Sequence, residues 1–360
     1  MAQIKLTTWN IEHMRHVVGD NLGDAAVARQ QKIVEEIRAI DPDILCVVEA
    51  SPDIVHMRDF AASALGGDYV LPAILGTDAA LAQNPDDPPA ALRQLYRMKG
   101  NVLTGSQWMW FLVKRGLADG AELLDPAVFD VLAGGPTWKV HRYGERRFRN
   151  HSHWRHPQVL VLELAGRRVD IIAAHMKSKL NTSRKRPFED DGVTFTEGYL
   201  REALNDRYEL ATEAVHVRNY IEARFAQEPD PAIFVVGDLN DGPGKERFET
   251  EFLFFDLLSN MQGDVFFARK FLNHALFDFE GDLRWSFRLD RNDPVDPGRD
   301  PHILLDHILF TQRLVNDTTL PQVHSGAGLV EHTIHAMINA ALPRSKRTSD
   351  HVPVSVAIEV

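Results

Sequence analysis

The side chains in this sequence that could do chemistry are acidic, amide and imidazole groups that follow or adjoin short apolar runs. They are Asn10, Glu49, His175, Asp238, Asn240, Asp306, Asp350 and His351. Carboxylate and amide oxygens suit a hard cation such as Mg²⁺ or Mn²⁺, which is held by few protein ligands and is shared with substrate phosphate. An imidazole beside a carboxylate can accept and return a proton. These residue types together indicate a site that handles phosphate esters.

Four of these groups stand at the ends of predicted β-strands. The apolar runs are residues 4–9 before Asn10, 44–48 before Glu49, 169–174 before His175 and 233–236 before Asp238. A rigid sheet fixes the side chains at its strand ends while the loops beyond it can vary, so ligands are often bound there. Each residue alone has a structural explanation, but their recurrence favours one shared site.

The helical segments lie between these strands. Apolar spacing predicts a helix over residues 24–40, and Ser51-Pro52-Asp53 predicts another helix with Pro52 at its first position, running toward Gly66. A longer helix is expected over residues 199–225. Its expected buried face contains Leu200, Leu204, Tyr208, Ala211, Val215 and Ile221.

The composition is that of a globular protein: 44 % of the 360 residues are hydrophobic and 25 % are charged. We expect one domain over residues 1–360, with surface insertions near 80–100, 180–198 and 260–302. The formal net charge of −11 provides no global attraction for a polyanion, so a polyanionic substrate would have to meet local basic patches. Cys46 is the only cysteine and is expected in the core, which excludes a disulfide framework.

The sequence predicts no membrane span and no signal peptide. It begins directly with the apolar run at residues 4–9, and no apolar run approaches the ~18 residues of a membrane span. A cytoplasmic monomer is the simplest expectation, and secretion stays open if a leader has been trimmed.

Six motifs occur in the chain order seen in the endonuclease/exonuclease/phosphatase superfamily. They are Thr8-Trp9-Asn10, the strand 44–49 ending in Glu49, Ala174-His175-Met176-Lys177-Ser178-Lys179, Gly237-Asp238-Leu239-Asn240, Leu305-Asp306-His307-Ile308-Leu309 and Ser349-Asp350-His351-Val352-Pro353-Val354. Each is weak alone, but six in order make chance an implausible explanation. The chain therefore resembles this superfamily, and His175 makes it more similar to the DNase I and sphingomyelinase branches than to the abasic-site repair branch.

The resemblance implies an α/β fold, a four-layer α/β/β/α sandwich of two packed mixed sheets. It implies Mg²⁺ or Mn²⁺ bound by Glu49, with Asn10 beside it and Asp350 acting directly or through water, and it leaves Ca²⁺ open as an additional structural ion. Asp238 and Asn240 would position the attacking water and a phosphate oxygen.

The proton-transfer roles follow from the same resemblance. His351 would be the general base, oriented by Asp306, and His175 would bind phosphate or protonate the leaving oxygen. Two positions depart from the DNase I-like pattern. Gln107 stands where a glutamate would orient His175, and Ala50-Ser51 follows Glu49 where some nucleases have an arginine.

Two basic segments are candidates for substrate contact. Residues 141–156 contain five arginines and four histidines, and this segment is either a phosphate-binding rim or a solvated basic face; a zinc site from His151 and His153 is a weaker alternative without a cysteine pair. The loop after His175 offers Lys177, Lys179, Arg184 and Arg186 as substrate contacts.

The function expected is metal-dependent phosphodiester hydrolysis, with DNA or RNA as substrate because basic loops flank the proposed site. The alternatives are a small-molecule or inositol-type phosphomonoesterase, a sphingomyelinase-like lipid phosphodiesterase and an inert partner-binding scaffold. A phenylalanine-rich region would serve a lipid enzyme, but core packing is the stronger interpretation. It contains Phe252, Phe254, Phe255, Phe266, Phe267, Phe271, Phe277 and Phe279.

Overall fold

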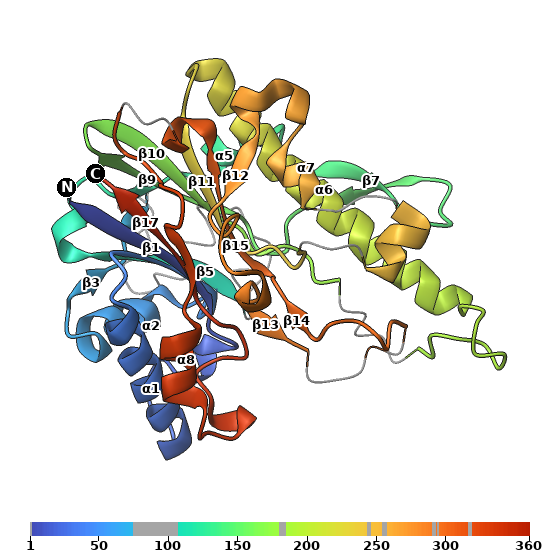
Figure 1. Ribbon diagram of the computed structural model, residues 1–360, viewed down its shortest axis with the longest axis horizontal. Helices are drawn as coiled ribbons and strands as arrows, with labels where there is room; N and C mark the ends of the chain where they lie inside the picture. The colour runs from blue at the N-terminus through green and yellow to red at the C-terminus, as the bar shows by residue number, and fades with distance from the viewer. Residues whose placement is uncertain are drawn as a thin grey trace.

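The structure is a computed structural model that describes residues 2–74, 107–179, 185–242, 246–253, 258–289, 293, 295–315 and 319–360. Most of its strands belong to two large sheets that lie together in the middle of the molecule. Helices α1, α2 and α8 lie on one side of the sheets and α5, α6 and α7 on the other (Figure 1). The insertion expected near residues 80–100 lies outside the described residues.

The first sheet has six strands in the order β16-β17-β1-β2-β5-β3. Their bounds are β16 (Gly328–Val330), β17 (Val354–Glu359), β1 (Gln3–Asn10), β2 (Ile44–Ala50), β5 (Trp108–Lys114) and β3 (Tyr69–Val70). Strand β1 pairs parallel with β2 and antiparallel with β17. The sheet is therefore mixed, and the ends of β1 and β2 that carry Asn10 and Glu49 lie at the same edge.

The second sheet has seven strands in the order β12-β15-β11-β10-β9-β6-β4. Their bounds are β12 (Leu272–His274), β15 (Asp306–Thr311), β11 (Ala232–Asp238), β10 (Arg167–Ala173), β9 (Gln158–Leu164), β6 (Glu122–Leu123) and β4 (Ala73–Ile74). Strands β10 and β11 are parallel, and β11 and β15 are antiparallel in a register that pairs Asp238 with Asp306. The first residue of β15 thus lies beside the last residue of β11.

Shorter elements complete the fold. Two-stranded ribbons pair β7 (Trp138–His141) with β8 (Phe148–His151) and β13 (Phe287–Arg288) with β14 (His302–Ile303). The α-helices are α1 (Asp24–Ile40), α2 (Ile54–Asp59), α5 (Pro126–Ala133), α6 (Glu197–Gln227), α7 (Ser259–Gln262) and α8 (His332–Asn339). The 3-10 and π turns are η1 (Met14–His16), η2 (Phe60–Ala64), η3 (Arg115–Leu117), η4 (Glu249–Leu253), η5 (Val265–Lys270), η6 (Gly281–Leu283), η7 (Gln312–Val315) and η8 (Arg344–Lys346). Part of the insertion expected near residues 260–302 is therefore regular structure.

Strand β11 shows how the layers pack. Successive side chains of a strand point to opposite faces, so Phe234 and Val236 join the core between the two sheets, while Ile233 and Val235 pack in the core beneath α6. Both faces are apolar because both are covered. The expected four-layer α/β/β/α sandwich with two mixed sheets is confirmed.

The predicted helices form, with two corrections. Residues 24–40 form α1 as expected, and α6 extends the helix expected over 199–225 by two residues at each end. The N-cap of α2 is Asp53, not Ser51, because the Asp53 carboxylate accepts from Val55 N at 2.9 Å, so Pro52 precedes the helix. Val215 is exposed rather than buried, since the apolar face of α6 is carried by residues such as Val217 and Ile221.

The phenylalanine-rich region is only partly core. Phe252 and Phe279 pack against the cores, but Phe266 is 91 % exposed and Phe277 81 % exposed, which makes the core-packing expectation wrong for them and for the exposed Phe267. Phe254 and Phe255 lie outside the described residues. Cys46 is buried as expected, and burial raises the pKa of its thiol to about 12, which suits a core side chain and not a nucleophile.

None of the described helices combines the length and the apolar composition that crossing a membrane requires.

Candidate active site

The two sheets are joined at their edge by a bond between the ends of β1 and β11. Asn10 Nδ2 donates to Asp238 Oδ2 at 3.0 Å, and both side chains are buried. The backbone of Asn10 is fixed as well, because Ser349 Oγ donates to its carbonyl oxygen at 2.6 Å. Residues 228 positions apart in the chain thus meet because their strands pack across one core.

The turn after β11 requires glycine and asparagine in unusual backbone conformations. Gly237 has φ +131°, and a Cβ there would lie 2.0 Å from the carbonyl oxygen of Ala174, so no side chain fits. Asn240 has φ 52°, a conformation that asparagine tolerates. Its backbone N donates to Asp238 Oδ1 at 2.9 Å, and its Nδ2 donates to Met176 O at 3.0 Å. The turn therefore holds the Asp238 carboxylate beside the segment that contains His175.

Asp306 and His351 form a buried pair next to Asp238. His351 Nδ1 lies 2.7 Å from Asp306 Oδ2, and the backbone N of Asp306 donates to Ser286 Oγ at 2.9 Å. The His351 ring also contacts the ring of Phe287, with 4.9 Å between centroids. The imidazole is thus held at one nitrogen by the carboxylate of a residue whose own backbone is held by Ser286.

Burial and charge shift the pKa values of this cluster in opposite directions. Burial and the neighbouring charge of Asp306 raise the pKa of Asp238 to about 7. Burial by itself would lower the pKa of His351, but the charge of Asp306, its hydrogen bond and the charge of Asp238 raise that pKa to about 10. At neutral pH His351 is therefore protonated and Asp238 is close to its titration midpoint, and such shifted pKa values are typical of acid–base sites.

Glu49 lies at an irregularity in β2. The register with β5 shifts between Val48 and Ala50, and Glu49 itself has φ 57°. Glu49 Oε2 accepts from His13 N at 3.0 Å and lies 3.2 Å from His13 Nδ1. Burial opposes ionisation of Glu49, yet the hydrogen bonds from His13 hold its pKa below the ordinary value. Glu49 is consequently an ionised carboxylate at neutral pH.

His175 is buried between Asp238 and Arg155. Its Nε2 lies 3.7 Å from Asp238 Oδ2, while its Nδ1 has no hydrogen-bond partner among the described residues. Burial and the charge of Arg155 hold the pKa of His175 well below its usual range, so the ring is neutral. Gln107, which the resemblance to the DNase I-like pattern places at the position of the orienting glutamate, accepts from Arg155 Nη2 instead.

Sequence reasoning missed the position of Arg155. It was only one of several arginines in residues 141–156, but its Nη1 donates to the carbonyl oxygens of His175 at 3.5 Å and Met176 at 3.4 Å. The charges of Asp238 and Glu49 act on its guanidinium. Arg155 therefore belongs to the site, and no signal in the sequence distinguished it from its neighbours.

The loop that carries Asp350 and His351 is held by helix α1. Arg29 donates through Nε to Arg347 O at 3.0 Å and through Nη2 to Thr348 O at 2.8 Å. The buried Glu36 accepts from Thr348 Oγ1 at 2.6 Å through its Oε2 and from Asn339 Nδ2 at 3.2 Å. Sequence reasoning did not find these positioning contacts either.

Asp350 lies at the border of the cluster and is half-buried. Its Oδ1 is 4.0 Å from His351 Nε2, and its Oδ2 accepts from Arg344 Nη2 at 3.3 Å. Its charge acts on Glu12, as does that of Arg29. Asp350 is thus near the free nitrogen of the imidazole.

The expected substrate-binding cations are engaged elsewhere. Lys179 Nζ is buried among three carboxylates: it pairs with Asp241, with Glu249 at 2.8 Å and with Glu246 at 3.4 Å. Its charge is therefore already neutralised, which corrects the expectation that it contacts substrate.

Two of the other expected cations, Lys177 and Arg186, are also paired with carboxylates. Lys177 Nζ lies 2.8 Å from Asp206, and the exposed Arg186 pairs with Asp190 at 2.7 Å. Arg184 lies outside the described residues.

The donor set fits a hard cation. Single ligand atoms of Asp238, Asp306 and His351 lie within 4.8 Å of one another. Asn10 Oδ1 and Asp306 Oδ1 are buried without a hydrogen-bond partner among the described residues, so two oxygens are left for a further ligand. A cation bound by Asp238, Asp306 and His351 would compete with the hydrogen bond between Asp306 and His351. Glu49 and Asn10 Oδ1 take no part in that hydrogen bond, so a cation held by them would leave it intact.

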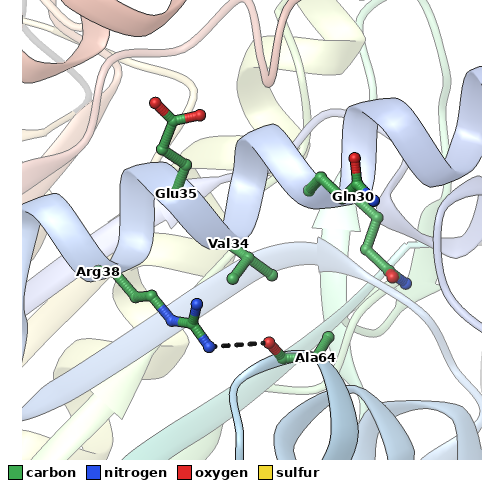
Figure 2. Close-up of a pocket in the computed structure, with 6 residues that line it drawn as sticks. Gln30, Val34, Glu35, Arg38 and Ala64 are labelled. Carbon is green, nitrogen blue, oxygen red and sulfur yellow. Dashed lines mark hydrogen bonds between the residues drawn. The ribbon is translucent and has the colours of Figure 1, made fainter.

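Two other features do not join this cluster. The histidines of residues 141–156 make no three-ligand group within the described ranges, because His151 bonds to Glu213 at 3.0 Å and His153 to His216 at 3.1 Å. A surface pocket of about 420 Å³ lies along α1, and Arg38 Nη2 donates to Ala64 O at 3.4 Å beside it. Figure 2 shows the side chains that line this hollow. None of the expected site residues lines that hollow.

A sequence profile of the Endonuclease/Exonuclease/phosphatase family matches residues 7–351, nearly the whole chain. The chain belongs to this family. Its members are phosphoesterase hydrolases, so the buried acid and imidazole cluster lies in a hydrolase scaffold. No curated protein sequence matches the chain.

Solved structures share the fold at low sequence identity. Truncated Caenorhabditis elegans TDP2 superposes with a TM-score of 0.50 at 14 % identity, covering 99 % of this chain and 98 % of that one. An endonuclease/exonuclease/phosphatase from Beutenbergia cavernae DSM 12333 gives 0.47 at 15 %, covering 100 % and 72 %. The human nocturnin catalytic domain, solved with a bound sulfate anion, gives 0.41 at 17 %, covering 99 % and 93 %. The likeness to TDP2 shows the family fold.

Proposed function

We propose that this member of the family is a divalent-metal-dependent phosphodiester hydrolase that acts on nucleic acid. The observation that carries the proposal is the Asp306–His351 pair at 2.7 Å, buried beside the Asp238 carboxylate that Asn10 contacts at 3.0 Å. A proton acceptor, the group that orients it and an anchored carboxylate are the parts that activation of water requires.

The residues proposed to hold the cation are Glu49 and Asn10, with Asp350 acting directly or through water. Glu49 is ionised and Asn10 Oδ1 lacks a partner among the described residues, which is the oxygen chemistry that Mg²⁺ or Mn²⁺ prefers. When bound, such an ion offsets the negative charge that develops on the phosphoryl oxygens.

The remaining steps, which are positioning of the water and the phosphate and transfer of a proton, would fall to other residues of the chain. Asp238 and the side chain of Asn240 hold the attacking water and a phosphate oxygen in position. His351 would take the proton of the water at Nε2, because Nδ1 is occupied by Asp306. It would do so from the deprotonated form of the ring, which a pKa of about 10 makes the minor form at neutral pH. Asp306 fixes the tautomer of the imidazole and stabilises the imidazolium after transfer.

His175 is proposed to bind a phosphate oxygen rather than to act as an acid. Its ring is neutral and buried, so it can donate one hydrogen bond but carries no extra proton at neutral pH. Arg155 behind it adds positive charge without leaving its carbonyl contacts. Leaving-group protonation would then fall to solvent or to another group.

A nucleic acid is favoured over a small monoester because positive charge reaches the site from a basic surface segment. Arg155 is the residue before the last in the segment 141–156, which contains five arginines, and its guanidinium contacts the His175 backbone. A phosphomonoesterase would instead need a closed pocket with several cations facing one phosphate, and Lys177, Lys179 and Arg186 are paired with carboxylates.

The test incubates the purified chain with Mg²⁺ or Mn²⁺ and a panel of substrates: plasmid, single-stranded DNA, RNA, a nitrophenyl diester, a nitrophenyl monoester and sphingomyelin. Diester cleavage is expected, and EDTA should abolish it. Asp238→Ala and His351→Ala should each reduce the rate by at least ~10³-fold, as loss of an essential catalytic group does.

Asp282→Ala removes an exposed carboxylate and serves as the matched control, with an unchanged rate expected. Full activity in Asp238→Ala or His351→Ala would contradict the residue assignment. Turnover of the monoester alone would move the function to the phosphatase alternative, and turnover of sphingomyelin alone would move it to the lipid alternative.

A further inference from the structure

The segment from Trp138 to His156, here called the basic arm, differs in charge from the rest of the chain. It contains six lysine and arginine residues and one acidic residue, Glu145, whereas the whole chain has a formal net charge of −11. Strands β7 and β8 form its body, and Figure 1 shows β7 beside α6, away from the two large sheets. The basic arm is therefore a local exception to the acidic surface.

The inner face of the basic arm is packed on α6. Val140 is buried, and the ring of Trp138 stacks on His216 with 4.2 Å between centroids. His151 Nε2 lies 3.0 Å from Glu213, and Tyr143 N donates to Asn205 Oδ1 at 2.8 Å. These contacts fix the arm in one position on the helix, so its outer face is a preformed surface.

Exposed aromatic rings lie on the outer face of the two strands and in the segments that flank them. Side chains alternate between faces of a strand, so Phe148 points away from the face that holds Val140 and His151. Phe148 is 65 % exposed, Tyr143 41 % and Trp154 58 %. The Phe148 ring lies against its cross-strand neighbour His141, with 5.4 Å between centroids. Three aromatic groups are thus available to a ligand.

Cations stand between these rings. Arg142 is paired with Glu209, and Arg149 with Glu145 at 2.6 Å. Arg146 and Arg147 are exposed and form no ion pair within the residues that the structure describes. Their charge is therefore free to meet an anion.

Two contacts join the basic arm to the candidate active site. Arg155 near its end donates to the carbonyl oxygens of His175 and Met176. Glu213 on α6 accepts from Lys177 N at 2.7 Å through Oε2 and contacts His151 through Oε1. Arg155 and Glu213 consequently hold the basic arm against the segment that contains His175. A nucleic-acid strand bound along the arm would therefore reach the site.

We propose that the basic arm binds single-stranded nucleic acid and guides it to the active site, an inference that rests on the proposed function. Arginines pair with phosphates, and exposed rings stack on bases, which is the combination that single-strand binding requires. A duplex hides the faces of its bases, so the exposed rings favour a single strand over a duplex.

The experiment measures binding by fluorescence anisotropy with a labelled oligothymidylate of roughly 12 nucleotides, long enough to span such a surface. The protein is the full chain with Mg²⁺, carrying His351→Ala so that the strand stays intact. The double variant Tyr143→Ala/Phe148→Ala should raise Kd about tenfold or more, because each removed ring takes away one stacking contact with a base. The matched control Val131→Ala removes an exposed apolar side chain on α5 and should leave Kd unchanged.

A second variant tests the charges. Arg146→Gln/Arg147→Gln should raise Kd and reduce the slope of log Kd against log salt by about 1.4, the value for two phosphate contacts on a single strand. Arg201→Gln on α6 is the control for an exposed arginine elsewhere. In a background with His351 intact, both arm variants should keep full cleavage of the nitrophenyl diester, which does not reach the arm.

Unchanged Kd in both arm variants would overturn the inference while diester cleavage still supported the proposed function. The inference would also be overturned if the arm variants lost duplex binding and single-strand binding equally. The same holds if they lost binding to phosphatidylserine vesicles or to an acidic peptide but still bound the single strand. Absence of any diester cleavage by the wild-type chain would instead contradict the proposed function itself.

Discussion

Asp306 Oδ2 and His351 Nδ1 lie 2.7 Å apart, at the start of β15 and just before β17, although the two residues are 45 positions apart in the chain. The carboxylate is fully buried, so its charge acts on the imidazole with little screening by water. This pair decides which imidazole nitrogen is left to face a substrate.

Asp306→Asn should lower the pKa of His351. In the folded chain the charge and hydrogen bond of Asp306 overcome burial and raise that pKa to about 10, so removal of the charge leaves burial, which favours the neutral ring. A ¹⁵N NMR titration of the metal-free protein should show the His351 midpoint at lower pH. Diester hydrolysis should fall by roughly 10²–10⁴-fold, because the wrong tautomer is populated. An unchanged midpoint would contradict the role of Asp306.

Asp238→Asn should stabilise the metal-free fold at alkaline pH while abolishing activity. Burial and Asp306 raise the pKa of Asp238 from 3.8 to about 7, so the folded state binds this proton more tightly than the unfolded state. Ionisation of Asp238 therefore lowers the free energy of unfolding as pH rises from 3.8 through 7, and the full loss remains above pH 7.

The difference in unfolding free energy between Asp238→Asn and the wild type should therefore shift in favour of the variant between pH 4 and pH 8, by on the order of 2–4 kcal/mol. Urea titrations at several pH values measure it. A difference that is independent of pH would show that Asp238 is ionised without cost in the fold.

Arg155→Ala should act through His175. Loss of the guanidinium frees the carbonyl oxygens of His175 and Met176 and removes a positive charge that lowers the pKa of His175. We expect kcat to fall by roughly 10–100-fold, the range for misplaced catalytic groups.

The pKa of His175 should rise in Arg155→Ala, which a purely structural role would not require. Arg155→Lys keeps the charge but cannot reach Gln107 and the carbonyl groups together, so it should restore the pKa of His175 better than it restores kcat. A shift in KM alone, without any change in the His175 titration, would argue against this positioning role.

Lys179→Met should destabilise the fold rather than weaken substrate binding. Lys179 Nζ lies among Asp241, Glu246 and Glu249. Removal of the cation leaves Asp241 and Glu249 without an ion-pair partner among the described residues, while Glu246 keeps its pairs with Arg207 and Arg299. Breaking such a cluster typically costs about 3–5 kcal/mol.

Thermal and urea unfolding measure this loss, and Arg186→Ala is the control, with a change within about 0.5 kcal/mol for an exposed side chain. Unchanged stability in Lys179→Met together with a higher KM would restore the interpretation of Lys179 as a substrate contact.

The sequence by itself determined the elements and the residues at their ends. Helix 24–40 has the predicted bounds, because the apolar period and breaking residues such as Pro42 are local signals. Asn10 and Asp238 are the last residues of their strands and Glu49 is the residue before the last for the same reason, and strands that pack in one core bring their ends together.

The tertiary structure alone decided which charged groups belong to the site. Arg155 and Lys179 both looked like cations near a phosphate, yet Arg155 reaches His175 and Lys179 is buried among acids. The contact of Glu36 with Thr348 joins residues 312 positions apart. Pairing between charged groups depends on their distance in space and on their burial. A periodic pattern along the sequence predicts neither that distance nor that burial.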